Sequence, residues 1–154
     1  MGKNEREGLE NEYRGLQVLA AMDEDDLLLS LTRHDETADR RLQAEADLSQ
    51  QWAIIAPVFP RSERAREEIN LFYFNELRYE VESKTGIWRK ALIRDPFGAW
   101  ADEPGFLLID PDIHWTMDLA RRCRQHVLVA GRVGQQARFI WLDSNPVRGF
   151  LGAR

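Results

Sequence analysis

Five arginines near the C-terminal end of the chain stand out chemically, because aromatic side chains follow them closely. They are Arg121, Arg122, Arg124, Arg132 and Arg138, followed by Phe139 and Trp141. Guanidinium groups pair with phosphates, and aromatic rings stack on unpaired bases. The combination predicts a basic face that binds nucleic acid. The alternative, given equal weight, is that both rings point into the core and that the arginines pair with the protein's own carboxylates.

Asp110, Asp112 and His114 place two carboxylates and an imidazole at alternate positions. Together with Asp95 they could hold Mg²⁺, Mn²⁺ or Zn²⁺ and support a metal-dependent hydrolysis. However, Asp-Pro-Asp is a common turn sequence, and a turn followed by a helix start is the simpler interpretation. We therefore expect no catalytic residue, no bound metal and no cofactor.

The single cysteine, Cys123, excludes an intramolecular disulfide and a multi-cysteine metal site. The neighbouring arginines would favour a reactive thiolate. A lone cysteine on an amphipathic helix is more often a small buried apolar residue, and this is the interpretation we favour.

The net charge of −5 is divided unevenly along the 154 residues. Residues 1–70 contain 9 Lys/Arg and 16 Asp/Glu, whereas residues 71–154 contain 12 and 10. Residues 119–154 contain seven arginines and one acidic residue. Such asymmetry suggests that the two ends of the chain meet different partners.

The acidic N-terminal half supports a second functional hypothesis. Asp23, Asp25 and Asp26 lie in the sequence MDEDD, which we expect at the start of a helix. Acidic helices can occupy a basic site on another protein, and electrostatic attraction would speed the encounter. An inhibitor or adaptor of the immunity-protein type would act in this way, with Trp100 as a further exposed contact residue. A solvated helix surface is the simpler alternative.

Helical periodicity dominates the first 70 residues and predicts four helices. They are expected over residues 9–20, from Asp23 to 31, from Asp35 to 55, and after Ser62.

From residue 76 the apolar period changes from 3.6 to 2, which predicts strands. A hairpin is expected from strands 76–82 and 87–94, and a helix capped by Thr116 over 117–125. The remaining strands are expected over 106–110, 126–133 and 137–143, and residues 95–105 should form a loop.

These elements define an α+β protein with acidic N-terminal helices followed by a small, mainly antiparallel sheet of order β-β-β-α-β-β. We expect a helical segment over 1–60 and a sheet domain over 61–154, packed as one compact unit. The order resembles the OB barrel, whose sheet face binds oligonucleotides, and the core of restriction-endonuclease-like nucleases. The nuclease pattern is incomplete, since the strand over 106–110 lacks the Glu-x-Lys that the resemblance requires.

The sequence thus predicts a non-enzymatic, cytoplasmic binding protein without a membrane segment. Nucleic acid is the first candidate partner, a basic protein is the second, and a metal-dependent hydrolase is the third hypothesis.

Overall fold

The computed structural model describes residues 2–57, 59, 67–84, 86–98 and 101–142, which form four helices and seven strands. The helices are α1 (Lys3–Arg14), α2 (Glu36–Ala46), α3 (Glu67–Ser83) and α4 (Ile113–Arg122). The strands are β1 (Gln17–Ala20), β2 (Leu27–Ser30), β3 (Gln51–Ile55), β4 (Ile87–Arg94), β5 (Glu103–Ile109), β6 (Val127–Arg132) and β7 (Arg138–Trp141).

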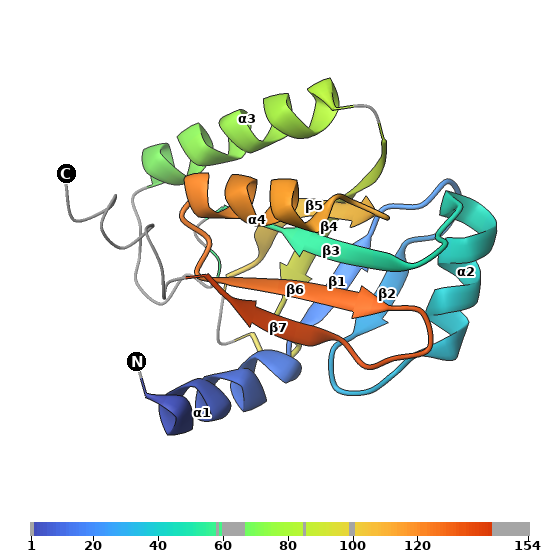
Figure 1. Ribbon diagram of the computed structural model, residues 1–154, viewed down its shortest axis with the longest axis horizontal. Coiled ribbons are helices and arrows are strands. Elements are labelled where there is room, and N and C mark those ends of the chain that lie inside the picture. Colours follow the sequence, from blue (N-terminus) through green and yellow to red (C-terminus); the bar gives the residue numbers. More distant parts are fainter. Residues whose placement is uncertain (1, 58, 60–66, 85, 99–100, 143–154) are drawn as a thin grey trace.

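All seven strands belong to one antiparallel sheet of order β2-β1-β4-β5-β3-β6-β7. Helices α3 and α4 lie over one face of this curled sheet, whereas α1 and α2 lie towards the other face (Figure 1). The sheet takes strands from both halves of the chain, so the acidic and basic halves of the sequence are interleaved.

The sheet separates two hydrophobic cores. In β3, Trp52 and Ile54 face the core beneath α1 and α2, while Ala53 and Ile55 face the core beneath α3 and α4. A strand that is covered on both faces has no polar side.

Two helices start at carboxylate caps. Asp35 accepts a hydrogen bond from the Ala38 N–H at 3.0 Å, which confirms the predicted start of a helix near Asp35. Asp112 accepts one from the Trp115 N–H at 3.0 Å, so α4 begins earlier than predicted. Thr116 lies inside α4, where its hydroxyl donates to the carbonyl of Asp112 at 2.8 Å.

The helix prediction is wrong over three stretches, which form the strands β1, β2 and β3. The first predicted helix ends at Arg14, and Asp23 starts no helix because it lies in the loop between β1 and β2. Strands β1 and β2 are four residues long and β3 is apolar on both faces, so none shows a clear two-residue period.

The strand predicted over 76–82 is also wrong, because these residues belong to α3. Leu77, Tyr79 and Val81 alternate in the sequence, but only Leu77 and Val81 are buried, and they are four residues apart. Tyr79 points to solvent with 70% of its surface exposed. The predicted hairpin is absent, and β4 pairs with β1 and β5.

The α+β class and the antiparallel sheet are confirmed, whereas the predicted element order and the OB-like layout are not. Only α1 precedes the sheet in the chain. The strands predicted over 87–94, 106–110, 126–133 and 137–143 correspond to β4, β5, β6 and β7. The predicted loop over 95–105 is too long, because β5 begins at Glu103 and pairs with β4 from there. Trp100 and Ser62 lie outside the described residues. No helix in the described part of the chain is long and apolar enough to cross a bilayer.

Candidate functional site

The five arginines of the predicted basic face fall into two groups. Arg121, Arg122 and Arg124 lie at the end of α4 and just before β6, whereas Arg132 and Arg138 lie beside the turn between β6 and β7. Since β6 has six residues, it separates the groups by roughly 17 Å along the strand. The structure therefore does not bring all five together.

The first group is engaged with nearby side chains. Arg121 pairs with Asp118 at 3.2 Å, and Arg122 pairs with Glu80 of α3 at 3.4 Å. The Arg124 guanidinium lies 5.7 Å from the centre of the Tyr73 ring. The two carboxylates belong to α3 and α4.

Phe139 and Trp141 are covered by α1. Arg14 lies over the Phe139 ring at 4.9 Å and Arg6 over the Trp141 ring at 5.4 Å. The Trp141 indole N–H donates to the Glu10 carboxylate at 2.8 Å. The two rings therefore serve packing between α1 and β7, as the alternative interpretation held.

Arg132 and Arg138 are exposed, and neither makes an ion pair with another described residue. Arg122, which is also exposed, differs from them by its ion pair with Glu80.

The carboxylates considered for metal binding accept hydrogen bonds from backbone N–H groups instead. Asp110 accepts hydrogen bonds from the N–H groups of Ser49, Gln50 and Gln51 at 2.8, 2.7 and 3.0 Å. Burial by itself would raise the pKa of Asp110, but these three hydrogen bonds outweigh it and lower the pKa below the ordinary value. The residue has φ +48°, a conformation that Asp tolerates better than most residues.

The other members of this set are also in structural positions. The hydrogen bond from the Trp115 N–H lowers the pKa of Asp112, and His114 is exposed on α4. Asp95 accepts a hydrogen bond from the Phe97 N–H at 2.9 Å. In the described ranges, no group of three His, Cys, Asp or Glu side chains is arranged to hold a metal ion.

Cys123 is buried behind α4, and burial raises the pKa of its thiol to about 12. The thiol is therefore protonated at neutral pH, which argues against nucleophilic catalysis.

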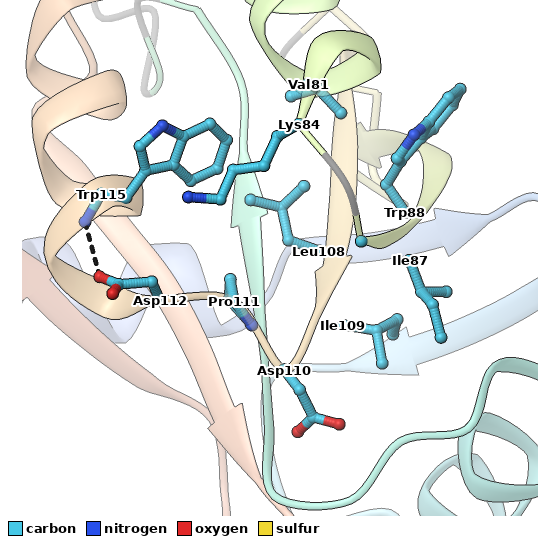
Figure 2. A pocket seen from close by; sticks show the side chains of 11 residues that line it. Val81, Lys84, Ile87, Trp88, Leu108, Ile109, Asp110, Pro111, Asp112 and Trp115 are labelled. Atoms are coloured by element: carbon cyan, nitrogen blue, oxygen red, sulfur yellow. Dashed lines mark hydrogen bonds between the residues drawn. The ribbon is translucent and has the colours of Figure 1, made fainter.

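A shallow pocket with an empty volume of about 410 Å³ lies between the end of α3 and the start of α4 (Figure 2). Val81, Ile87 and Leu108 give it apolar walls, and Lys84 extends beside Trp115, with its Nζ 4.2 Å from the ring centre. The pocket contains no base placed against a nucleophile.

The loop between β1 and β2 is strongly acidic. Asp23, Glu24, Asp25 and Asp26 are consecutive, and all four are exposed. Asp23 pairs with Arg89 of β4 at 2.8 Å. No described cation forms an ion pair with the other three carboxylates. The loop therefore presents three carboxylates to solvent.

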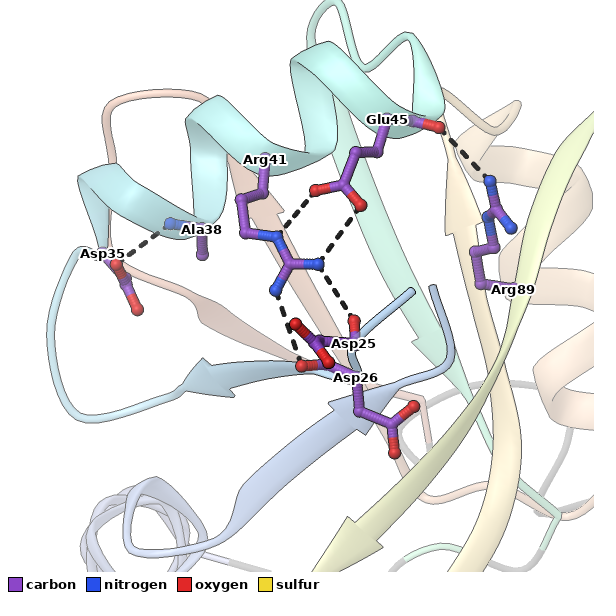
Figure 3. Close-up of polar contacts among 7 residues, drawn as sticks. All are labelled: Asp25, Asp26, Asp35, Ala38, Arg41, Glu45 and Arg89. Atoms are coloured by element: carbon purple, nitrogen blue, oxygen red, sulfur yellow. Dashed lines mark hydrogen bonds and ion pairs between the residues drawn. The ribbon is translucent and has the colours of Figure 1, made fainter. Parts of the chain in front are cut away.

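The backbone of this acidic loop is fixed by Arg41 of α2 (Figure 3). The Arg41 guanidinium donates to the carbonyls of Asp25 at 2.9 Å and Asp26 at 3.5 Å. It also forms a two-point contact with the Glu45 carboxylate at 2.7 and 3.2 Å. This contact lowers the pKa of Glu45 and raises the pKa of Arg41, so both groups stay charged.

Arg89 provides a second anchor for the acidic loop. Besides its contact with Asp23, it donates to the carbonyl of Glu45 near the end of α2 at 3.2 Å (Figure 3). The sequence prediction missed the roles of Arg41 and Arg89. A signal for Arg89 was available in the sequence. It lies on the same strand face as the apolar residues Ala91 and Ile93, where a charged residue needs a partner.

No family model, curated protein or solved structure matches this chain.

Proposed function

We propose that the protein is a non-enzymatic binding protein that docks a positively charged surface of another protein onto the acidic loop at residues 23–26. The observation that carries the proposal is the clamp by Arg41. It holds the carbonyls of Asp25 and Asp26, while the three carboxylates at positions 24–26 face solvent.

A fixed loop binds more tightly than a flexible one, because less conformational entropy is lost on association. Its carboxylates also attract a cationic partner over a distance and favour partners of matching charge. Strand β2 follows the loop directly and is an edge of the sheet, where Leu28 is 42% exposed. An exposed apolar side chain next to charged groups is typical of a protein interface with a polar rim.

The proposal is tested by affinity capture with three forms of the protein. The first is the wild type, and the second is the loop variant Glu24→Gln, Asp25→Asn, Asp26→Asn. The third is a control with the same charge change on exposed positions of α1, namely Glu5→Gln, Glu7→Gln, Glu12→Gln. A basic protein retained by the wild type and the control, but lost by the loop variant, supports the proposal. Equal retention by all three overturns it.

The role of the clamp is tested with the captured partner and the variant Arg41→Gln. This change leaves the loop carboxylates in place but weakens the hold on the backbone carbonyls. We expect binding by calorimetry to weaken by about tenfold, with a less favourable entropy. Unchanged affinity would show that the fixed backbone contributes nothing.

Nucleic-acid binding at Arg132 and Arg138 is a second candidate function, supported by the exposure of both guanidinium groups. Because phosphate contacts release counterions, such binding should weaken steeply as salt is raised. Mobility-shift assays with single- and double-stranded oligonucleotides should show a complex at about 50 mM salt that Arg132→Gln with Arg138→Gln removes. Absence of a shift with the wild type would exclude it.

A further inference from the structure

Helix α3 carries exposed apolar side chains opposite its buried face. The helix lies at the outside of the molecule (Figure 1), and Leu77 and Val81 belong to the hydrophobic core between it and the sheet. Leu71 and Phe72 are each 59% exposed, and Tyr79 is 70% exposed. With 3.6 residues per turn, these three side chains fall within roughly 100° of one another around the helix axis, on the side away from the core. An apolar stripe on the solvent side of a surface helix marks an interaction surface.

Asn75, which is also exposed, lies at the centre of this group. It is four residues after Leu71, three after Phe72 and four before Tyr79, so each of the three lies one helical turn away from it. We call these four residues the α3 stripe. The Asn75 amide both donates and accepts hydrogen bonds, so it is complementary to a second copy of itself. A single Asn within an apolar contact between helices fixes their register and number, which favours a second copy of α3 as the occupant of the stripe.

The charges beside the α3 stripe indicate how two copies are arranged. Glu76 lies on one flank and Arg78 on the other, each roughly 80° from the centre of the stripe, and both are exposed. A two-fold axis parallel to the helices brings opposite flanks together, so the carboxylate flank of each copy meets the guanidinium flank of the other. An antiparallel pair would instead place like charges on the same flank. The flanking charges therefore favour a parallel pair.

We propose that the protein forms a parallel two-fold dimer in which the α3 stripe packs against the same stripe of a second copy. Glu82 extends the stripe and meets its counterpart in the second copy, with Arg78 four residues before it on the same helix. This pair of like charges opposes the dimer. The stripe and its flanking charges also fall well short of the roughly 20–30 residues on each side of a standard interface. The dimer is therefore weak, with a dissociation constant in the micromolar range.

Sedimentation velocity on the full chain, extended to high micromolar concentrations, measures the dimer. Leu71→Ser and Tyr79→Ser should each raise the Kd of the dimer at least about tenfold. Glu82→Gln should lower this Kd by about threefold, because it removes the pair of like charges. The matched control Leu28→Ser changes an apolar side chain that is 42% exposed on β2, and it should leave the Kd within about twofold. Circular dichroism should show that all four variants are folded, since the changed side chains are exposed.

Disulfide cross-linking tests the direction of the two helices. In the parallel dimer, Asn75→Cys and Glu82→Cys should each form a disulfide with the same position of the second copy. In an antiparallel pair centred on Asn75, the two copies of position 82 would lie roughly 21 Å apart along the helices, too far for a disulfide. The native Cys123 is only 2% exposed and should take no part. Gln135→Cys, in the exposed turn between β6 and β7, is the control that should stay uncross-linked.

Three outcomes would overturn the inference. A wild type that stays monomeric at every concentration would leave the α3 stripe to another protein or to solvent. A dimer that Leu28→Ser weakens as much as Leu71→Ser would not use the stripe, and cross-linking at position 75 without position 82 would contradict the parallel arrangement. The acidic-loop variant used to test the proposed function should dimerise like the wild type, so failure of the dimer and failure of the proposed function are distinguishable.

Discussion

Gln125 uses every polar atom of its side chain in the core. Its amide oxygen accepts from the Ala56 N–H at 3.1 Å, and its amide nitrogen donates to the carbonyls of Ile54 and Val127 at 3.2 and 3.0 Å. The side chain is 2% exposed. It therefore satisfies backbone groups of two separate segments where water cannot replace it.

Replacing Gln125 by Leu should lower the free energy of unfolding by about 2–4 kcal/mol, because three buried backbone groups lose their partner. Urea denaturation measures the change. The control Gln135→Leu alters an exposed residue of the turn between β6 and β7 and should change stability by less than about 0.5 kcal/mol. Similar effects of both substitutions would mean that the hydrogen bonds of Gln125 contribute little.

Asp110 makes a contribution that depends on pH. Its folded-state pKa is lowered, so the ionised carboxylate stabilises the fold at pH values above its unfolded-state pKa of about 4. This stabilisation is lost as the pH falls through the lower folded-state pKa. Asp110→Asn should cost about 1–2 kcal/mol at neutral pH, since an amide accepts less well from three N–H groups.

The difference in free energy of unfolding between the wild type and Asp110→Asn should be constant above about pH 5 and shrink below about pH 4. Urea titrations at several pH values measure it. Asn tolerates the positive φ of this position, so the comparison isolates the charge. A difference that persists unchanged into strong acid would contradict the assigned role.

The sequence predicted the local roles of single residues better than their distant contacts. The interpretation of residues 110–112 as a turn before a helix agrees with the hydrogen bonds of Asp110 and the cap at Asp112. The ion pair of Arg41 and Glu45 was missed, although two residues four apart on one helix are neighbours on its surface. The contacts of Arg41 with Asp25 and Asp26 span 16 and 15 residues, and only the packing of α2 beside β2 creates them.

At the scale of elements, strands were predicted correctly where a strand was long or ended at a clear turn. Strand β4 has eight residues, and β6 and β7 flank the turn that contains Gly134 with φ +81°. The misassigned segments all have apolar residues whose spacing fits both periods. Contacts with distant parts of the chain decide which period is used. In α3, the buried residues Leu77 and Val81 are four apart, as in a helix.

The absence of a side chain at Gly131 of β6 leaves room for the Trp52 ring of the neighbouring strand β3. Gly131 lies opposite Trp52 in the register of β3 and β6, and a Cβ atom at this position would overlap the Trp52 indole ring. We expect Gly131→Ala to lower the free energy of unfolding by about 1–3 kcal/mol, because the ring must move within a packed core. Combining it with Trp52→Phe should cost less than the sum of the single changes, since the smaller ring leaves room for the methyl group.

The control for this prediction is Gly8→Ala in the exposed part of α1, where a Cβ atom would meet nothing within 4 Å. It should raise the free energy of unfolding by about 0.5–1 kcal/mol, because Ala favours a helix more than Gly does. Thermal denaturation of the four variants measures both effects. Strict additivity of the changes at Gly131 and Trp52 would argue against the contact.

At the scale of the whole molecule, the acidic and basic halves of the sequence contribute neighbouring strands to one sheet. Strand β1 lies between β2 and β4, and β3 lies between β5 and β6. The pairings of β1 with β4 and of β3 with β5 and β6 join segments far apart in the sequence, and no periodicity specifies them. The contacts of α1 with Phe139 and Trp141 arise in the same way, which explains why the sequence could not decide whether the two rings stack on bases or pack inside the protein.

Because the sheet is curled, the side chain of Arg14 can contact the chain beside both edge strands, β2 and β7. Arg14, the last residue of α1, donates to the Leu31 carbonyl after β2 at 3.1 Å and to the Ala137 carbonyl before β7 at 2.9 Å. No strand pairing in the described sheet joins β2 to β7. We infer that Arg14 helps to maintain the curl by bridging the edges.

Arg14→Met keeps an apolar stem over Phe139 but removes the donors to both carbonyls. It should lower the free energy of unfolding by about 2–3 kcal/mol. In hydrogen exchange followed by mass spectrometry, protection should fall first in β2 and β7, while the central strands β3 and β5 keep theirs until global unfolding. Arg33→Met is the matched control, since Arg33 is exposed just after Leu31 and forms no ion pair within the described residues. Equal loss of protection in all strands would show that Arg14 adds general stability and does not act on the edges, because a bridge between edges affects those edges before it affects the centre of the sheet.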